Sequence, residues 1–492
     1  MCHPSKSRLV AFCLAAWVGV GWSLGSRGQQ APLDESPTSQ SVYDVEPQHL
    51  WNRLHDTFFI RVGPDGRAYG QDRLEPLLWT SSRHLLVEAS HKRAIALLEE
   101  FLNDNGEKWI EDPLKRALLQ RDLWLVFNWL EGYRGVFAEP AIKPEVARAA
   151  QERLRRPLAA VIGRLALSPK KIQNLPDNYA AAVASGQFAR RIDPEQPGKP
   201  YLPPDLFVAD GPWVCVGRTD GHTAPQHLQE GGGNHFTNSV FLVFLRLPSG
   251  RAATAEYLKQ LCCFDQPLLV RNPEDANRLP FVPNQQLPQF PKGTELALVR
   301  RAMLIDSSHR VVVSPLTESV QLRVFHGEIP ALTRQVLHDS ENLRAFDALG
   351  RNSETRRRVG SWLSFHEFRL SRTQLLADRA GGLRAVDSEE RDFKTGFNAH
   401  PWDEFERRLP TDQSFAKSRR RTIKETCFAC HSLPGVYSFQ SLQHLRSGME
   451  GAGDKLSPFP LSEMPISAVA GAAVKWKQGR PNWISLQKLL AE

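Results

Sequence analysis

The spacing of apolar residues changes near residue 189, and this change most constrains the fold. Between residues 91 and 167 apolar side chains recur every three or four positions, which predicts amphipathic helices. Further along, runs rich in Val, Leu, Phe and Thr predict strands at 213–217, 239–248, 294–306 and 311–325. The two patterns predict an α+β chain with a helical N-terminal region and a strand-rich middle region.

The chain of 492 residues is long enough for several regions. A Pro-rich stretch at 189–207 separates the helical pattern from the strand pattern. We expect six segments: a signal peptide at 1–30, a linker at 31–45, a helical region at 46–188, a strand-rich region at 189–330, a mixed α/β connecting region at 331–403, and a C-terminal domain at 404–492.

The N-terminus has the order of a secretory signal. Lys6 and Arg8 precede an apolar run of 16 residues, 9–24, and small and polar residues follow. A membrane span usually needs about 20 apolar residues, so a retained anchor is the alternative interpretation. The sequence therefore predicts an exported protein, periplasmic or extracellular, that contacts a membrane only if this segment is not cleaved.

The amino-acid composition excludes several classes of protein. Apolar residues make up 41% and charged residues 24%, which argues against a mostly disordered, collagen-like or polytopic membrane chain. The net charge of +8 is spread along the chain and does not indicate nucleic-acid binding. Seven cysteines are too few for a disulfide scaffold. A disulfide between Cys215 and either Cys262 or Cys263 stays open.

The most specific motif is Cys427-Phe428-Ala429-Cys430-His431. It has the form CxxCH, which is the attachment pentapeptide of c-type haem. Two thiols three positions apart on a helical turn can each add to one vinyl group on the same edge of the porphyrin. His431 then lies under the ring and can bind the iron. A local Cys427–Cys430 disulfide, half of a zinc site and a thioredoxin-like redox pair are the alternatives.

With this motif, the C-terminal residues resemble a class I cytochrome c domain. That resemblance covers roughly 80 residues and implies a small all-α domain carrying one covalent haem c. Residues 414–426 would form the leading helix and 482–492 the closing helix. Met464 follows His431 by 33 residues and precedes Pro465, as a distal methionine ligand in that family does.

The distal iron ligand decides the chemistry. Met464 is the tentative choice, and the alternatives are Met449, His444 or another histidine, and an open iron. Methionine and histidine together raise the reduction potential and suit electron transfer, whereas an open iron permits reactions with peroxide or gases.

We therefore expect one-electron transfer through haem, with Cys427 and Cys430 as covalent attachment points and His431 as the proximal ligand. No catalytic residue is assigned. A basic stretch before the motif is either a docking site for an acidic redox partner or a solvated helix face; its residues are Lys417, Arg419, Arg420, Arg421 and Lys424. The alternative functions are a peroxidase-like haem enzyme and a haem-free secreted binding or structural protein with a Cys427–Cys430 disulfide.

Two groups of histidines have less specific patterns. His222, His227 and His235 surround the glycine-rich segment 231–235, which has no phosphate-binding spacing and is interpreted as a flexible turn. His84 and His91 share a helix face with Glu88, and that spacing is more typical of a polar surface than of a metal site.

Overall fold

Residues 1–35 and 36–492 form two units, and the computed structural model describes only parts of the second. The described residues are 42–132, 142–327, 362–392, 421–439 and 461–492, with gaps at 63–65, 67, 71–83, 219–222, 225–226, 228–237, 268, 272–280, 285, 389, 425–426, 428–430 and 432–434. The predicted signal peptide lies outside them. Within them, no helix combines the length and apolar character needed to cross a membrane.

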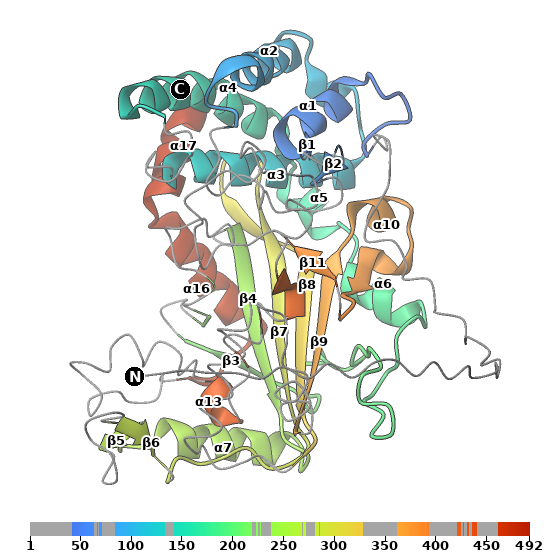
Figure 1. Ribbon diagram of the computed structural model, residues 1–492, viewed down its shortest axis with the longest axis vertical. Helices are drawn as coiled ribbons and strands as arrows, with labels where there is room; N and C mark the ends of the chain where they lie inside the picture. Colours follow the sequence, from blue (N-terminus) through green and yellow to red (C-terminus); the bar gives the residue numbers. More distant parts are fainter. Residues whose placement is uncertain are drawn as a thin grey trace, which may run out of the picture. The chain divides into compact units, whose positions relative to one another are not determined.

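A seven-stranded antiparallel sheet dominates the structure (Figure 1). Its strands are β3 (Val214–Gly217), β4 (Ser239–Arg246), β7 (Thr294–Ile305), β8 (Val311–Phe325), β9 (Leu363–Leu370), β10 (Leu383–Ala385) and β13 (Ser462–Glu463). They lie in the order β10-β9-β8-β7-β4-β3-β13. The four apolar runs in the middle of the sequence do form strands, and together they make up the centre of this sheet.

The long hairpin between β7 and β8 is closed by a local side chain. Ile305 pairs with Val311, and the intervening Asp306 carboxylate accepts hydrogen bonds from the backbone N–H groups of Ser308 (2.8 Å) and Arg310 (2.9 Å). An aspartate that bonds its own turn in this way holds the two strands in one register.

Helices gather at the end of the sheet where this turn lies (Figure 1). They are α1 (Leu50–Phe59), α2 (Glu88–Asn103), α3 (Pro113–Gly132), α4 (Pro144–Arg164) and α5 (Pro169–Gln173). The short helix α6 (Asn178–Ala184) lies alongside the sheet, where Asn178 donates to the Thr317 carbonyl of β8 (2.9 Å). The side-chain amide of Gln120 on α3 donates to the Ile305 carbonyl (2.9 Å) and accepts from the Ile305 N–H (3.0 Å). This pair of bonds attaches α3 to the end of β7.

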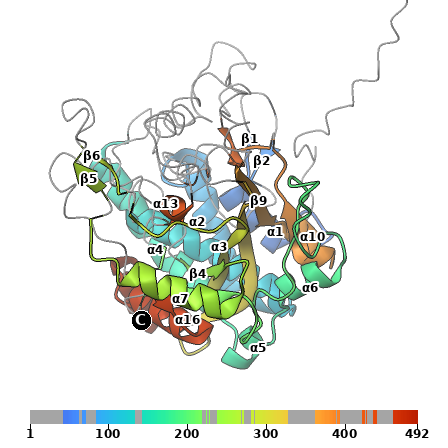
Figure 2. The ribbon, with the colours of Figure 1, turned by 90° about the horizontal axis from the view of Figure 1, so that it is seen from below.

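The remaining elements are helices, short 3₁₀ turns and two-stranded ribbons outside the large sheet. The helices are α7 (Arg251–Cys262), α10 (Arg372–Leu376), α13 (Val436–Phe439), α16 (Ile466–Gln478) and α17 (Pro481–Ala491), with 3₁₀ turns at Gly106–Lys108 and Ala380–Gly382. Three small ribbons pair β1 (Arg61–Val62) with β2 (Ala68–Tyr69), β5 (Leu269–Arg271) with β6 (Phe281–Pro283), and β11 (Arg391–Asp392) with β12 (Arg421–Thr422). Figure 2 views the structure from the end that carries α7.

The two faces of the sheet differ in chemistry, because successive residues of a strand point to opposite sides. The core face belongs to the main hydrophobic core; its central residues are Val240, Leu242, Val299, Val320 and Leu322. The residues between them form the opposite side, which we call the polar face: Phe241, Leu298, Arg300, Gln321, Arg323 and Glu367. Buried charged groups on the polar face need partners, so this face is where a site is expected.

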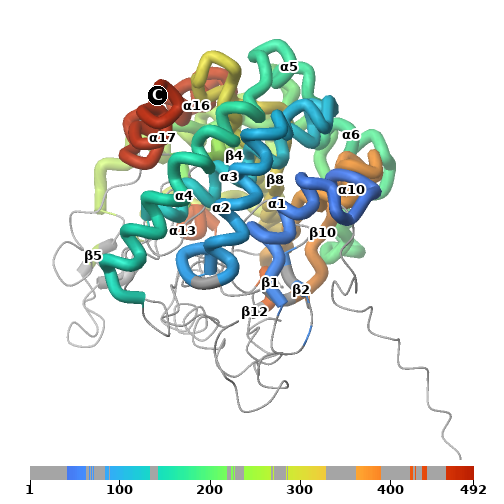
Figure 3. The backbone as a smooth tube through the Cα atoms, turned by 90° about the horizontal axis from the view of Figure 1, so that it is seen from above, coloured from blue at the N-terminus to red at the C-terminus, as the bar shows by residue number. Residues whose placement is uncertain are grey.

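The predicted fold class, with a small all-α cytochrome c-like domain at the C-terminus, is wrong. β13 pairs with β3 in the large sheet, and Val469 and Ala473 of α16 belong to the core over that sheet. α17 forms where a helix was predicted, but it packs beside α3 and α4 (Figure 3), with its Trp483 ring 5.7 Å from the ring of Trp124. The apolar side chains of these helices fill a shared core, so they cannot also close a separate domain.

Candidate haem-attachment site

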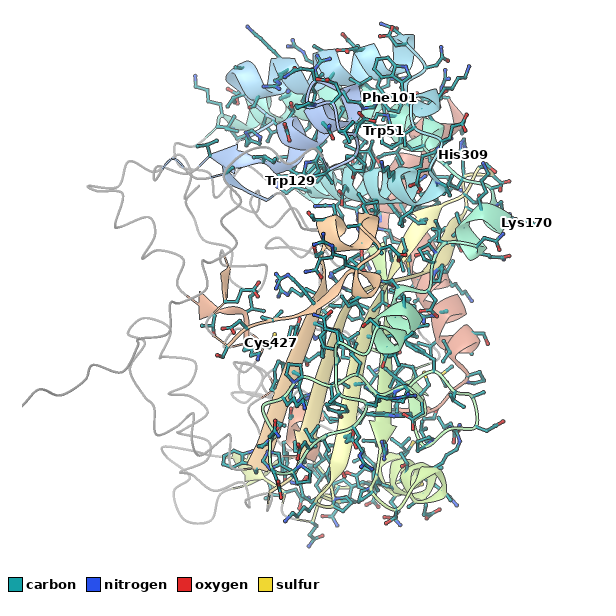
Figure 4. All side chains as sticks on the ribbon, turned by 90° about the vertical axis from the view of Figure 1, so that its right-hand side faces the viewer. Trp51, Phe101, Trp129, Lys170, His309 and Cys427 are labelled. Carbon is teal, nitrogen blue, oxygen red and sulfur yellow. The ribbon has the colours of Figure 1, made fainter. Side chains whose placement is uncertain are left out.

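The CxxCH segment is held in place on both sides. Before it, β12 pairs with β11, and the Ile423 N–H donates to the Glu390 carbonyl (2.9 Å). After it, the Tyr437 hydroxyl of α13 donates to the Asn284 carbonyl (2.6 Å), and Val436 is fully buried. The two anchors place the motif against the polar face of the sheet. In Figure 4, Cys427 lies beside the sheet, on the side away from the helix coloured faint red, which is α16.

His431 is bonded to a strand residue far away in the sequence. Nδ1 of His431 lies 3.1 Å from Nη1 of Arg323 on β8. The same Nη1 donates to Ser438 Oγ (2.5 Å), and Ser438 Oγ donates to the His431 carbonyl (3.0 Å). His431 is only 7% exposed. The network fixes both the position and the orientation of the imidazole ring.

His431 is a neutral imidazole in this setting. Burial lowers its pKa well below the usual value, and the nearby Arg323 and His227 lower it further. Arginine only donates hydrogen bonds, so Nδ1 of His431 accepts and the proton of the neutral ring is on Nε2. A neutral imidazole is the form that binds a transition metal.

His227 lies next to His431. The two ring centroids are 6.1 Å apart and the ring planes differ by 9°. The His227 ring also lies 5.1 Å from the ring of Phe241 on β4, and its backbone N–H donates to the Ala224 carbonyl (3.0 Å). Burial, and then the charge of Arg323, lower the pKa of His227 to about 4, so it too is neutral at neutral pH.

Arg323 is a buried cation, 5% exposed, in the middle of the sheet. Burial lowers its pKa to about 10, and the nearby Cys427 partly offsets this effect. Its hydrogen-bond partners among the described residues, His431 and Ser438, are both neutral. A buried cation held by neutral groups suits a negatively charged or electron-accepting group bound nearby.

Cys427 is half-buried and interacts electrostatically with Arg323 and Lys424. Burial lowers the pKa of Lys424, while Asp387, Glu367 and Glu390 raise it. Lys424 therefore faces carboxylates of its own chain. Cys430, the second predicted attachment thiol, lies outside the described residues, as do Lys417, Arg419 and Arg420 of the basic stretch.

Met464, the predicted distal ligand, lies away from His431. Its backbone N–H donates to the Cys215 carbonyl (3.0 Å), and its side chain packs against the main core. Arg323 sits between Leu322 and Val324, which point into that core, so Arg323 and the bonded His431 are on the other side of the sheet. The structure thus does not bring Met464 and His431 together. Met449 and His444 lie outside the described residues.

The remaining cysteines and histidines singled out in the sequence lie in ordinary structural environments. Cys215 is buried, Cys262 and Cys263 are exposed, and all three are free thiols, so the disulfide left open among them does not form. Burial raises the pKa of Cys215 to about 12. His84 and His91 are bonded to the backbone carbonyls of Thr57 and Leu85. Over the part of the chain that the structure describes, no three His, Cys, Asp or Glu side chains gather as a metal site.

Sequence reasoning missed Arg323 and discounted His227. The signal for Arg323 was a charged residue within the apolar strand run QLRVF (321–325). No comparison identifies the chain: no family model, no curated protein and no solved structure matches it.

Proposed function

We propose that this chain is an exported c-type haem protein that carries one covalent haem and transfers single electrons. Cys427 and Cys430 hold the haem, and His431 is its proximal iron ligand. The observation that carries the proposal is the state of His431: buried, neutral, and fixed in orientation by Arg323 directly after two cysteines of a CxxCH motif. The residues present therefore fit a haem group.

Attachment needs no leaving group. Each thiol adds its sulfur to one vinyl carbon and its hydrogen to the other, so one C–S bond forms and the C=C bond becomes single. The bound haem supplies one-electron chemistry, in which iron alternates between Fe(III) and Fe(II). His431 would bind iron through the lone pair of Nε2, so the proton of its neutral ring would move from Nε2 to Nδ1, and the Arg323 N–H would no longer donate to Nδ1.

The chain itself contributes electrostatics. Arg323 places a buried positive charge beside the proposed proximal ligand. A buried positive charge stabilises Fe(II) relative to Fe(III), because the oxidised centre carries one more positive charge. Arg323 therefore raises the reduction potential, which suits an acceptor of electrons from a partner protein. We keep an acidic redox partner in this proposal. Lys424 is not counted among the charges that would dock it, because carboxylates of its own chain surround Lys424.

The test is a set of optical spectra of the full chain, expressed where haem-attachment machinery is present. We expect a reduced spectrum typical of haem c, haem that stays on the chain in a denaturing gel, and a protein mass increased by one haem. Cys427→Ala should lose one thioether and shift the pyridine haemochrome band. Cys262→Ala is the matched control, because Cys262 is a free exposed thiol away from the site.

A protein without Soret absorption and with the mass of the bare mature chain contradicts this proposal. Such a result favours the haem-free binding or structural protein with a Cys427–Cys430 disulfide. A haem that reacts rapidly with peroxide favours the peroxidase-like alternative.

A further inference from the structure

We propose that His227 is the second axial ligand of the haem iron, opposite His431. This inference rests on the proposed function and specifies its iron site: a haem bound by two histidines. The observation behind it is the geometry of the two rings, whose centroids are 6.1 Å apart with planes within 9° of parallel.

The separation is the one that a shared metal ion requires. An imidazole nitrogen lies about 2 Å from a bound transition-metal ion and about 1 Å from its own ring centre. Two imidazoles on opposite sides of one ion therefore have centroids roughly 6 Å apart. Their planes are free to be parallel in that arrangement. The observed pair has the centroid distance that this arrangement requires and the near-parallel planes that it allows.

Direct stacking does not account for the pair. Stacked rings touch at about 3.5 Å between their planes. With centroids 6.1 Å apart, such rings would be shifted sideways by roughly 5 Å, which leaves almost no overlap between two five-membered rings. The parallel orientation of His227 and His431 thus gains little from their contact, and a group bound between the rings explains it.

The surroundings of His227 fit a haem face. The small cluster beside it consists of Ala224 and Phe241, with Leu298 and Trp476 packed against them. These side chains offer an apolar wall of the kind that lines haem pockets. A neutral histidine ring in such surroundings can donate a nitrogen lone pair to iron with no proton lost beyond a change of tautomer.

The sheet itself separates the other described candidate from the site. Met464 packs against the core face beside Gly217, whereas His227 contacts Phe241 on the polar face. A methionine ligand would have to pass through the plane of β3 and β4, or the strand β13 would have to leave the sheet. His227 needs no such rearrangement.

The experiment uses the purified full-length holoprotein. We expect the wild type to give electron paramagnetic resonance and near-infrared dichroism spectra of low-spin iron with two nitrogen ligands. His227→Gly should convert the iron to high-spin, and added imidazole should restore the low-spin spectrum by filling the space of the deleted ring. His366→Gln is the matched control: a buried histidine, on the core face beside Tyr201, whose replacement should leave the iron spectra unchanged.

Three results would overturn the inference. They are a wild-type spectrum with sulfur ligation that Met464→Leu abolishes, a high-spin wild type, and a His227→Gly protein that stays low-spin without imidazole. The wild-type spectra decide the matter even if His227→Gly fails to fold. Absence of covalent haem overturns the proposed function and this inference together, whereas covalent haem with other ligation overturns the inference alone.

Discussion

Nη1 of Arg323 lies 3.1 Å from Nδ1 of His431, although 108 residues separate them in the sequence. Arg323 lies near the C-terminal end of the long strand β8, and His431 is the last residue of a short motif. A charged donor on Nδ1 withdraws electron density from the ring, whereas a backbone carbonyl or carboxylate at this position increases the basicity of the ligand. Arg323 therefore holds the His431 ring in place and makes it less basic.

On the proposed function, replacing Arg323 with Gln should lower the reduction potential of the haem. The change removes a buried unit charge, whose Coulomb energy with another charge about 8 Å away is about 2 kcal/mol at an effective dielectric constant near 20. That energy corresponds to on the order of 100 mV for one electron. Potentiometric titration followed by absorbance measures it. Arg156→Gln, on the exposed surface of α4, is the control, and an unchanged potential in Arg323→Gln would refute this role.

Replacing Gly217 with Ala should destabilise the protein by about 1–3 kcal/mol through overpacking. A Cβ there would lie 2.6 Å from Val469 Cγ2 and 2.9 Å from Met464 Sδ, both closer than van der Waals contact. Met464→Leu alone should cost less than about 1.5 kcal/mol. Urea unfolding of the two variants checks both values. Gly250→Ala is the comparison for backbone strain. Its added Cβ would meet open space, but φ at Gly250 is positive, so any loss of stability there comes from the backbone rather than from overpacking.

Breaking the buried ion pair between α3 and α10 should be costly. Arg372 Nη2 lies 2.5 Å from Asp122 Oδ2, and both side chains are fully buried. Arg372→Met leaves the carboxyl without its counter-charge, and we expect about 3–5 kcal/mol of lost stability in urea unfolding. Asp122→Leu combined with Arg372→Met should recover more than half of that loss. A single variant within about 1 kcal/mol of wild type would contradict the prediction.

His366 should make the fold less stable in mild acid. Burial, and then the charges of Lys424 and His326, lower its folded-state pKa from 6.5 to about 4. Between these values the unfolded chain binds a proton that the folded chain does not, so stability falls as pH decreases through this window. The loss is about 2 kcal/mol at pH 5.

The measurement for His366 is urea unfolding at pH 7.5 and pH 5. His366→Gln should show about 2 kcal/mol less pH dependence than wild type. His309→Asn in the β7–β8 turn, where the histidine is only half-buried, is the control. Equal pH dependence in wild type and His366→Gln would show that another group dominates.

The sequence alone determined the local features. The β-branched and aromatic runs predicted β4, β7 and β8, because a half-buried strand has few other ways to place such side chains. The resemblance to a cytochrome c domain predicted a helix at 482–492, where α17 forms. The CxxCH motif predicted His431 as a ligand, since its chemistry depends on neighbours within five positions.

Tertiary structure decided the rest. The last helices joined the shared core through β13 and Gly217, which no local pattern encodes, because sheet pairing depends on partners hundreds of residues away. His227 and Arg323 reach His431 only after β4, β7 and β8 are in register, when strand alternation sends Phe241 and Arg323 to the same face. The CxxCH motif is a local feature of the sequence, whereas the register of the sheet determines which residues lie beside His431.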